Sequence, residues 1–484
     1  MSLSLALNTA RSSIFATSTQ IETTARNISG ASDAGSSRKI AVTTTSATGG
    51  AYVVSISRAV DTELYSRMLG ATSRTADQQS VLDGLDRLQA VVGDPASETS
   101  VGARIGKLDD ALVTYANAPD EPALGSALVT TARDLATTLN SASAAVQTVR
   151  SEADTAMARS VARVNDLLGQ FESENIAVVR GTSLGADVTD ALDRRDGILS
   201  KIAEEMGVTT QTRGNNDMVI YTDSGVTLFE TRPRAVAFKE TPVYQPGTVG
   251  RSVTVDGVEV TGADATMPLS SGRLVGLATL RDDVTVTFQT QLDETARGLI
   301  EAFAEKDRTA TGGPARPGLF TAGSTSLPTA STGLAGRIAV SAAADPSRGG
   351  SPTVLRDGGI NGAAYVANAS GQAGYAGALN GLHDTLGAIR SFDATSQLDP
   401  KQSLKDFSSA SIGWLAGVRQ NTSSSVDSTK ALLAHASNAL SNATGINMDD
   451  EYARQLELER SYQASSKLIS VISGLFDTLM QSVR

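Results

Sequence analysis

Apolar residues recur at coiled-coil spacing at both ends of the chain. Toward the C-terminus, steps of four and three residues alternate through Leu458, Tyr462, Ser465, Ile469, Ile472, Phe476, Leu479 and Val483, with Leu468 beside them. Toward the N-terminus, a seven-residue repeat runs through Leu7, Ile14, Ile21 and Ile28. This alternation is typical of a coiled-coil seam. It predicts terminal helices over 3–28 and 447–484 that pair with each other, with neighbouring copies, or with both.

Local signals define where both terminal helices begin and end. Asn447 precedes the acidic run 449–451, where an Asn side chain caps free backbone N–H groups and carboxylates suit the positive end of a helix dipole. Gly30 follows the first helix at a position where glycine ends helices. The alternative, that both helices belong to an ordinary core, stays open. The narrow apolar stripes favour a separate terminal unit.

Helical periodicity also dominates the middle of the chain. The longest stretch, about 122–179, keeps heptad spacing with one stutter near residue 157 and predicts a helix of roughly 80 Å at 1.5 Å per residue. The molecule is therefore expected to be elongated. Further helices are predicted at 59–92, 105–119, 187–206, 280–303, 375–392 and 404–441.

The period changes to two in other segments, which predicts strands. A hairpin is expected over 39–45 and 52–57. Short strands divided by Gly, Asn, Asp and Pro are expected at 208–212, 218–222, 226–230, 235–239, 252–255 and 259–261. Residues 309–374 are rich in Gly, Ser, Thr and Pro and predict a loosely structured surface region with one strand near 337–341.

These elements predict a mainly α protein with a β insert. The fold is an elongated multi-domain rod, in which the terminal helices form a coiled-coil-like domain, long helices form a bundle and a small all-β domain is attached. The expected domains are a terminal domain of 1–30 and 447–484; a helical body of 31–206, 276–308 and 375–446; an all-β insert of 207–275; and an irregular surface region of 309–374.

Composition narrows the possible functions. The 484 residues include no Cys and two His, so thiolate sites are excluded and histidine-based sites are poorly supplied. The net charge of −11 argues against nucleic acid and anionic membrane surfaces as partners. No apolar run approaches the roughly 20 residues of a membrane span, and no signal peptide is recognisable. We expect a cytoplasmic protein or one exported without a cleaved signal.

No candidate chemistry outweighs its structural explanation. The carboxylates at 449–451 fit a helix start, and Arg194, Arg195 and Asp196 fit a solvated helix face better than an anion site. Residues 102–107 depart from the spacing of a phosphate-binding loop. His383 and His435 fit polar helix faces, and Trp414 fits the core. We predict no catalytic, cofactor-binding or metal site, and hence no enzyme.

Several segments resemble bacterial flagellar axial proteins, and most closely the hook-associated protein 1 family. Residues 445–451 (GINMDDE) and 461–469 (SYQASSKLI) resemble the C-terminal signature of that family, and 24–28 (TARNI) resembles the end of its N-terminal helix. The internal segments 190–199 (DALDRRDGIL), 271–277 (SGRLVGL) and 291–296 (QLDETA) separate it from rod and hook relatives. At 35–38 (GSSR), Ser36 replaces the tyrosine usual in the family.

The resemblance implies a structural role at the junction between hook and filament. It implies an extracellular flagellar location, reached through type III export. The implied partners are further copies in a ring, the hook protein, the second junction protein, the export apparatus and a chaperone on the C-terminal helix. The assembly interface would comprise the seam residues named above. The alternatives are another axial protein, such as the hook subunit or second junction protein, or an exported adhesin or enzyme using the β insert.

Overall fold

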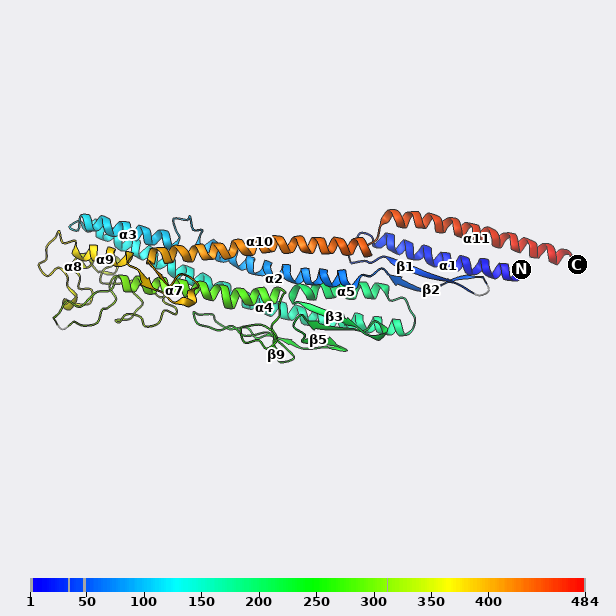
Figure 1. The fold of residues 1–484 in the computed structure, drawn as a ribbon, viewed down its shortest axis with the longest axis horizontal. Coiled ribbons are helices and arrows are strands. Elements are labelled where there is room, and N and C mark those ends of the chain that lie inside the picture. The colour runs from blue at the N-terminus through cyan, green and yellow to red at the C-terminus, as the bar shows by residue number, and fades with distance from the viewer. Residues whose placement is uncertain (1–2, 34, 47–48, 311, 483–484) are drawn as a thin grey trace.

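The molecule is an elongated rod with a two-helix arm at one end (Figure 1). The structure, a computed structural model, describes residues 3–33, 35–46, 49–310 and 312–482. The start of α1 and the end of α11 both point to the free tip of the arm, where α11 extends further (Figure 1). The arm consists of the helices α1 and α11 and the hairpin strands β1 and β2, which span Leu3–Gly30, Met448–Ser482, Lys39–Thr45 and Ala51–Arg58.

Long helices that pack side by side build the rod. Its helices are α2, Thr62–Val92; α3, Val101–Asn117; α4, Pro122–Ser183; α5, Thr189–Glu205; α6, Arg273–Thr279; α7, Thr285–Ala302; and α10, Leu404–Thr444. With 62 residues, α4 is about 93 Å long at 1.5 Å per residue. It exceeds the predicted helix by one turn, 180–183, which follows the last buried residue, Val178.

The helix predicted from residue 280 begins earlier than expected. Its first part is α6, which continues through the π-helical turn η2, Leu280–Val284, into α7. Apolar side chains within 274–280 are buried in the core. The segment is therefore helical, although Gly272 and Gly276 weaken the helical signal in the sequence. The last residues of the predicted insert, 273–275, therefore lie in α6.

The insert contains two small antiparallel sheets on the side of α4. One has the order β3-β4-β5-β6 and the other β7-β8-β9. The strands span Val208–Thr212, Met218–Thr222, Thr227–Glu230, Arg232–Pro233, Val236–Ala237, Thr254–Val255 and Val258–Glu259. Each predicted strand corresponds to one of these, although the last three are only two residues long.

Residues 303–403 cover the far end of the rod with short elements and loops. These are β10, Phe320–Thr321; β11, Ala339–Val340; α8, Thr353–Asp357; α9, Gly377–Gly387; β12, Arg390–Ser391; β13, Lys401–Gln402; and the 3₁₀ turns Pro346–Arg348, Ala363–Tyr365 and Ala394–Ser396. A further 3₁₀ turn, Gly214–Asn216, lies in the insert. The helix predicted at 375–392 is thus shorter than expected.

The prediction that residues 309–374 are loosely structured is wrong. Phe320, Leu334 and Ile338 are buried in the main core. The Asp293 carboxylate accepts hydrogen bonds from the backbone N–H groups of Gly333 and Ala335, both at 2.8 Å. A glycine-rich composition indicates that regular helices and strands are scarce. It does not indicate disorder, because buried apolar side chains and carboxylates that bind the backbone fix this segment.

Candidate functional site: a two-helix arm and its joint with the rod

The helices α1 and α11 lie antiparallel along the whole arm (Figure 1). The Oγ atoms of Ser13 and Ser465 approach within 3.4 Å midway. The buried positions of α1 are small, among them Ala10, Thr17 and Thr24, so the two helices can approach closely. The predicted heptad residues Leu7, Ile14, Ile21 and Ile28 flank this line and are half-buried.

The predicted interface residues of α11 fall into two groups. Leu458 and Ile472 are buried, and Ile469 and Phe476 are half-buried. Tyr462, Leu468 and Leu479 are exposed. Val483 lies outside the described residues. The first group belongs to the α1–α11 contact side, and the second leaves apolar surface open. That either group forms an assembly interface stays a prediction.

The hairpin is fixed to the end of α1 by one buried amide. The Asn27 side chain is 1% exposed. Its Nδ2 donates to the carbonyl oxygen of Lys39, and its Oδ1 accepts from the Lys39 backbone N–H, both at 2.9 Å. An amide that satisfies both backbone groups of one residue aligns strand β1 with α1. The contact gives the resemblance at 24–28 a structural reason.

A cluster of charged residues then joins the hairpin to α5 of the rod. The buried Asp193 carboxylate accepts from Arg58 Nη1 at 3.0 Å and from the Ser37 hydroxyl at 2.6 Å. Asp196 binds Arg58 Nη2 at 2.6 Å, and Asp190 binds Lys39 Nζ at 2.7 Å. We call Lys39, Arg58, Asp190, Asp193 and Asp196 the joint cluster.

The terminal helix α1 adds a second contact to the same part of α5. The Arg26 guanidinium binds Asp187 at 2.7 Å and Asp190 at 2.9 Å. The hydrogen bond from Lys39, opposed by burial, holds the pKa of Asp190 below its usual value. Burial opposes the charged form of Asp187, but hydrogen bonds from Arg26 and Thr189 lower its pKa on balance.

The prediction of a solvated face for 194–196 is correct only for Arg194, which pairs with Glu174 at the surface at 2.9 Å. Arg195 is 2% exposed and donates to Asn175 Oδ1 at 2.9 Å and to the Asn216 carbonyl at 2.6 Å. Asp196 belongs to the joint cluster, and burial raises its pKa. The sequence alone did not show that the hairpin covers this face of α5.

The start of α11 combines a helix cap with a buried ion pair. Asn447 Oδ1 accepts from the Asp449 backbone N–H at 3.0 Å, as expected for a helix cap. Glu451 is instead 1% exposed and binds Arg38 Nε at 2.7 Å. The Arg38 backbone N–H donates to the Thr444 carbonyl at 2.9 Å. Arg38 therefore holds the α10–α11 connection against the base of the hairpin.

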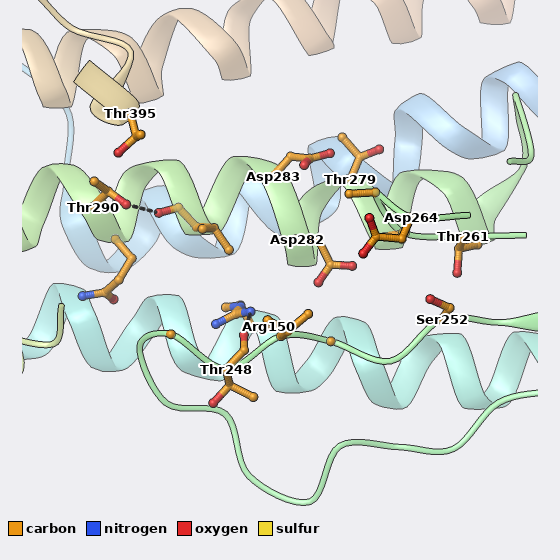
Figure 2. A pocket seen from close by; sticks show the side chains of 18 of the residues that line it. Arg150, Thr248, Ser252, Thr261, Asp264, Thr279, Asp282, Asp283, Thr290 and Thr395 are labelled. Atoms are coloured by element: carbon orange, nitrogen blue, oxygen red, sulfur yellow. Dashed lines mark hydrogen bonds between the residues drawn. The ribbon is translucent and has the colours of Figure 1, made fainter. Parts of the chain in front are cut away.

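The β insert borders a groove of about 700 Å³ beside η2 and α7. Figure 2 shows Asp264, Asp282 and Asp283 around it, with Arg150. Burial raises the pKa of Asp283, and that of Asp293 to about 6. Carboxylates with a raised pKa in a groove are what the alternative hypothesis of an exported enzyme requires. Asp293 is already bound to the loop at 333–335, and Asp282 pairs with Arg281 at 2.7 Å.

Other candidate residues take ordinary positions. His383 of α9 pairs with Asp109 at 2.6 Å, His435 is exposed on α10, and Trp414 packs against the core. In the described part of the chain, no three His, Asp or Glu side chains are grouped so that they could hold a metal ion. None of the described helices is long and apolar enough to span a membrane.

Comparison with known proteins adds sequence relatives. A family model described as the flagellar hook-associated protein FlgK helical domain matches residues 85–317, and one described as the flagellar basal body rod FlgEFG protein C-terminal region matches 437–482. Flagellar hook-associated protein 1 of Salmonella typhimurium is 23% identical over 316 residues, which cover 62% of this chain and 56% of the relative. The Escherichia coli K12 protein of the same name is 22% identical over 315 residues, with the same coverage.

A solved structure, the flagellar hook junction protein FlgK from Burkholderia pseudomallei, aligns with 20% identity and a TM-score of 0.43 over 53% of this chain and 47% of that chain. The chain spans about half the length of the curated relatives that it matches. The two family models fall on the rod with its insert and on the α10–α11 segment. Over its rod and insert, this chain is similar to the helical domain of the flagellar hook-associated protein FlgK family.

Proposed function

We propose that this protein is a structural subunit of the junction between flagellar hook and filament, built into the axis through its terminal arm. The observation that carries the proposal is the arm itself. It pairs the two terminal helices and leaves apolar side chains of α11 exposed, within a chain whose rod and insert are similar to the FlgK helical domain. Exposed apolar rows on a protein of this charge are typical of surfaces that become covered in an assembly.

The proposed division of the chain follows this role. Residues 1–30 and 447–484 form the assembling domain. The helical body of 31–206, 276–308 and 375–446, apart from the hairpin 39–58 that lies in the arm, faces outward together with the β insert of 207–275, whose last residues already belong to α6, and 309–374 covers the far end of the rod. The proposed partners are further copies, the hook protein and the second junction protein.

The proposed route to this location is export through the flagellar apparatus without a cleaved signal, with a chaperone on the C-terminal helix. The fully open side of α11 supports this, because a chaperone can cover its apolar residues before assembly. The same role leaves no catalytic task for the chain. The groove beside the insert does not change this conclusion, since Asp282 and Asp293 are engaged in holding the fold.

The test is removal of the gene, followed by electron microscopy and assay of the culture medium. We expect bare hooks and filament subunits shed as monomers, and restoration of filaments by the intact gene. A matched complementation with a gene lacking residues 447–482 should leave the hooks bare. Normal filaments in the deletion strain would contradict the proposal.

A further inference from the structure

The hairpin has an apolar outer face that nothing in the described chain covers. Ile40, Val42, Tyr52 and Val54 are between 37% and 59% exposed. We call these four residues the hairpin face. No charged residue occurs from 40 to 57, although exposed two-stranded ribbons usually carry charges that prevent unwanted pairing. An uncharged face of this kind is easily desolvated by a second apolar surface.

A second apolar face lies on α11, beside its contact with α1. Leu468, Val471, Leu475 and Leu479 follow one another at steps of three, four and four residues, so they form one row on the helix. Each is at least 50% exposed. We call this row the outer stripe. Residues 468–476 are also uncharged.

The two faces lie at different levels along the arm. The hairpin starts beside Asn27 and reaches Ser12, where the absence of a side chain at Gly50 leaves room for the serine. Gly49 also lies beside Thr9, and Ser465 lies level with Ser13, so the outer stripe begins near the hairpin tip and extends away from it toward the free end of the arm. The centre of the stripe is displaced from the centre of the hairpin by about 15 helical residues, or roughly 20 Å at 1.5 Å per residue.

The faces therefore cannot meet within one copy, and their size argues against a stable pair in solution. A half-exposed aliphatic side chain can bury roughly 50 Å² more, so four on each side bury roughly 200 Å². A stable interface needs roughly 800 Å² per partner. Such a small contact stabilises an ordered assembly, in which each copy makes the contact twice, once with each face. It does not stabilise an isolated pair of copies.

We propose that the hairpin face of one copy docks on the outer stripe of the next, with the two arms displaced by roughly 20 Å along their length. The inference rests on the proposed function, in which copies assemble through their arms. Because the two faces differ, the contact is head-to-tail, and because it includes an axial step it builds a stepped arrangement of arms and not a flat ring.

Disulfide cross-linking tests this contact without background, because the chain has no Cys. The test pair is Val54→Cys with Leu475→Cys in one chain, expressed in place of the native protein, with junctions isolated and oxidised. The control pair is Val54→Cys with Leu456→Cys. Leu456 is 58% exposed on α11 but lies level with the hairpin, so this pair reports arms without a step. A disulfide needs Cα atoms within about 7 Å.

We expect a ladder of covalent multimers from the test pair, and none from the control pair or from either single variant. A ladder from the control pair would overturn the axial step, and dimers from a single variant would overturn the head-to-tail contact. If neither pair links while filaments grow normally, the inference fails and the proposed function stands. If a pair blocks filament growth, Val42→Cys with Val471→Cys samples the same two faces.

Discussion

At the level of single residues, the contact between the start of α11 and the base of the hairpin depends on Glu451. Its side chain is 1% exposed and binds Arg38 at 2.7 Å. Removing one partner of such a pair leaves a buried charge unpaired. We predict that Arg38→Met destabilises the closed arm by about 3 kcal/mol. Hydrogen exchange should then show roughly 100-fold lower protection of the hairpin and the start of α11, at 1.4 kcal/mol per factor of ten.

Glu451→Gln is the matched control, because its amide oxygen still accepts the hydrogen bond from Arg38. We expect it to cost about 1 kcal/mol. Amides of α4 serve as an internal reference in both variants, since the rod core does not contact this pair. Equal loss of protection in the two variants would show that the charge of Glu451 is not what Arg38 stabilises.

The residues of the joint cluster mark the limit of sequence reasoning at this scale. The pattern of Asp190, Asp193 and Asp196, spaced by three residues, was available as one face of a helix. Its partners Lys39 and Arg58 lie more than 130 residues away in the sequence and opposite each other at the base of the hairpin. Charged residues on a helix face normally indicate solvent. Only the tertiary position of the hairpin shows that this face is covered.

At the level of elements, the stability of the arm depends on the contact between α11 and α1. Ile472 is 6% exposed on the contact side of α11. We predict that Ile472→Asp costs at least about 3 kcal/mol, through lost apolar burial and the desolvated carboxylate, and separates α11 from α1. Circular dichroism should keep the helical signal of the rod, and electron microscopy should show hooks without filaments.

Gln463→Asp is the control for this variant, because Gln463 is exposed on α11 and away from both apolar rows. It introduces the same charge into the same helix and should leave filament growth intact. Loss of the rod signal in Ile472→Asp would mean that the arm and rod fold as one unit, which would contradict a separate assembling domain.

The contact between α1 and α5 should depend on pH. The pKa values of Asp187 and Asp190 are lowered in the folded chain, so their contribution to stability is complete above the usual Asp pKa of about 3.9 and is lost as the pH falls through the lowered values. We predict that hydrogen exchange of α1 accelerates below about pH 4 relative to α4. Asp190→Asn should weaken this dependence, and an unchanged profile would contradict the assignment.

Helices and strands with strong periodicity could be predicted from the sequence almost to the residue. The strand 39–45 and the strands 208–212 and 218–222 have the predicted bounds. The errors lie where local signals conflict with packing. The helix α6 contains Gly276, which fits closely against α2, and residues 309–374 lack periodicity but contribute Phe320 and Ile338 to the core. Periodicity does not record such contacts.

At the level of the whole molecule, a buried polar network helps to hold the β insert to the rod. The Asp154 carboxylate of α4 accepts from Arg281 Nη1 at 2.6 Å, from the Tyr244 hydroxyl at 2.7 Å and from the Thr241 backbone N–H at 2.7 Å. Arg281 is fully buried in the π-helical turn. Burial and the bond to Asp154 raise the pKa of Tyr244 to about 12, so the hydroxyl remains a donor.

We therefore predict that Asp154→Asn loosens the insert while the arm stays closed. The amide keeps the shape of the carboxylate but removes the charge opposite Arg281 and places N–H groups against the donors, at a cost of about 3 kcal/mol. Hydrogen exchange should accelerate over 236–259 and leave α1 and α11 unchanged. Asp166→Asn, exposed on the same helix, is the control. Faster exchange in the arm would show that insert and arm are coupled through α4, so that a contact on the outer surface of the rod would influence assembly at its other end.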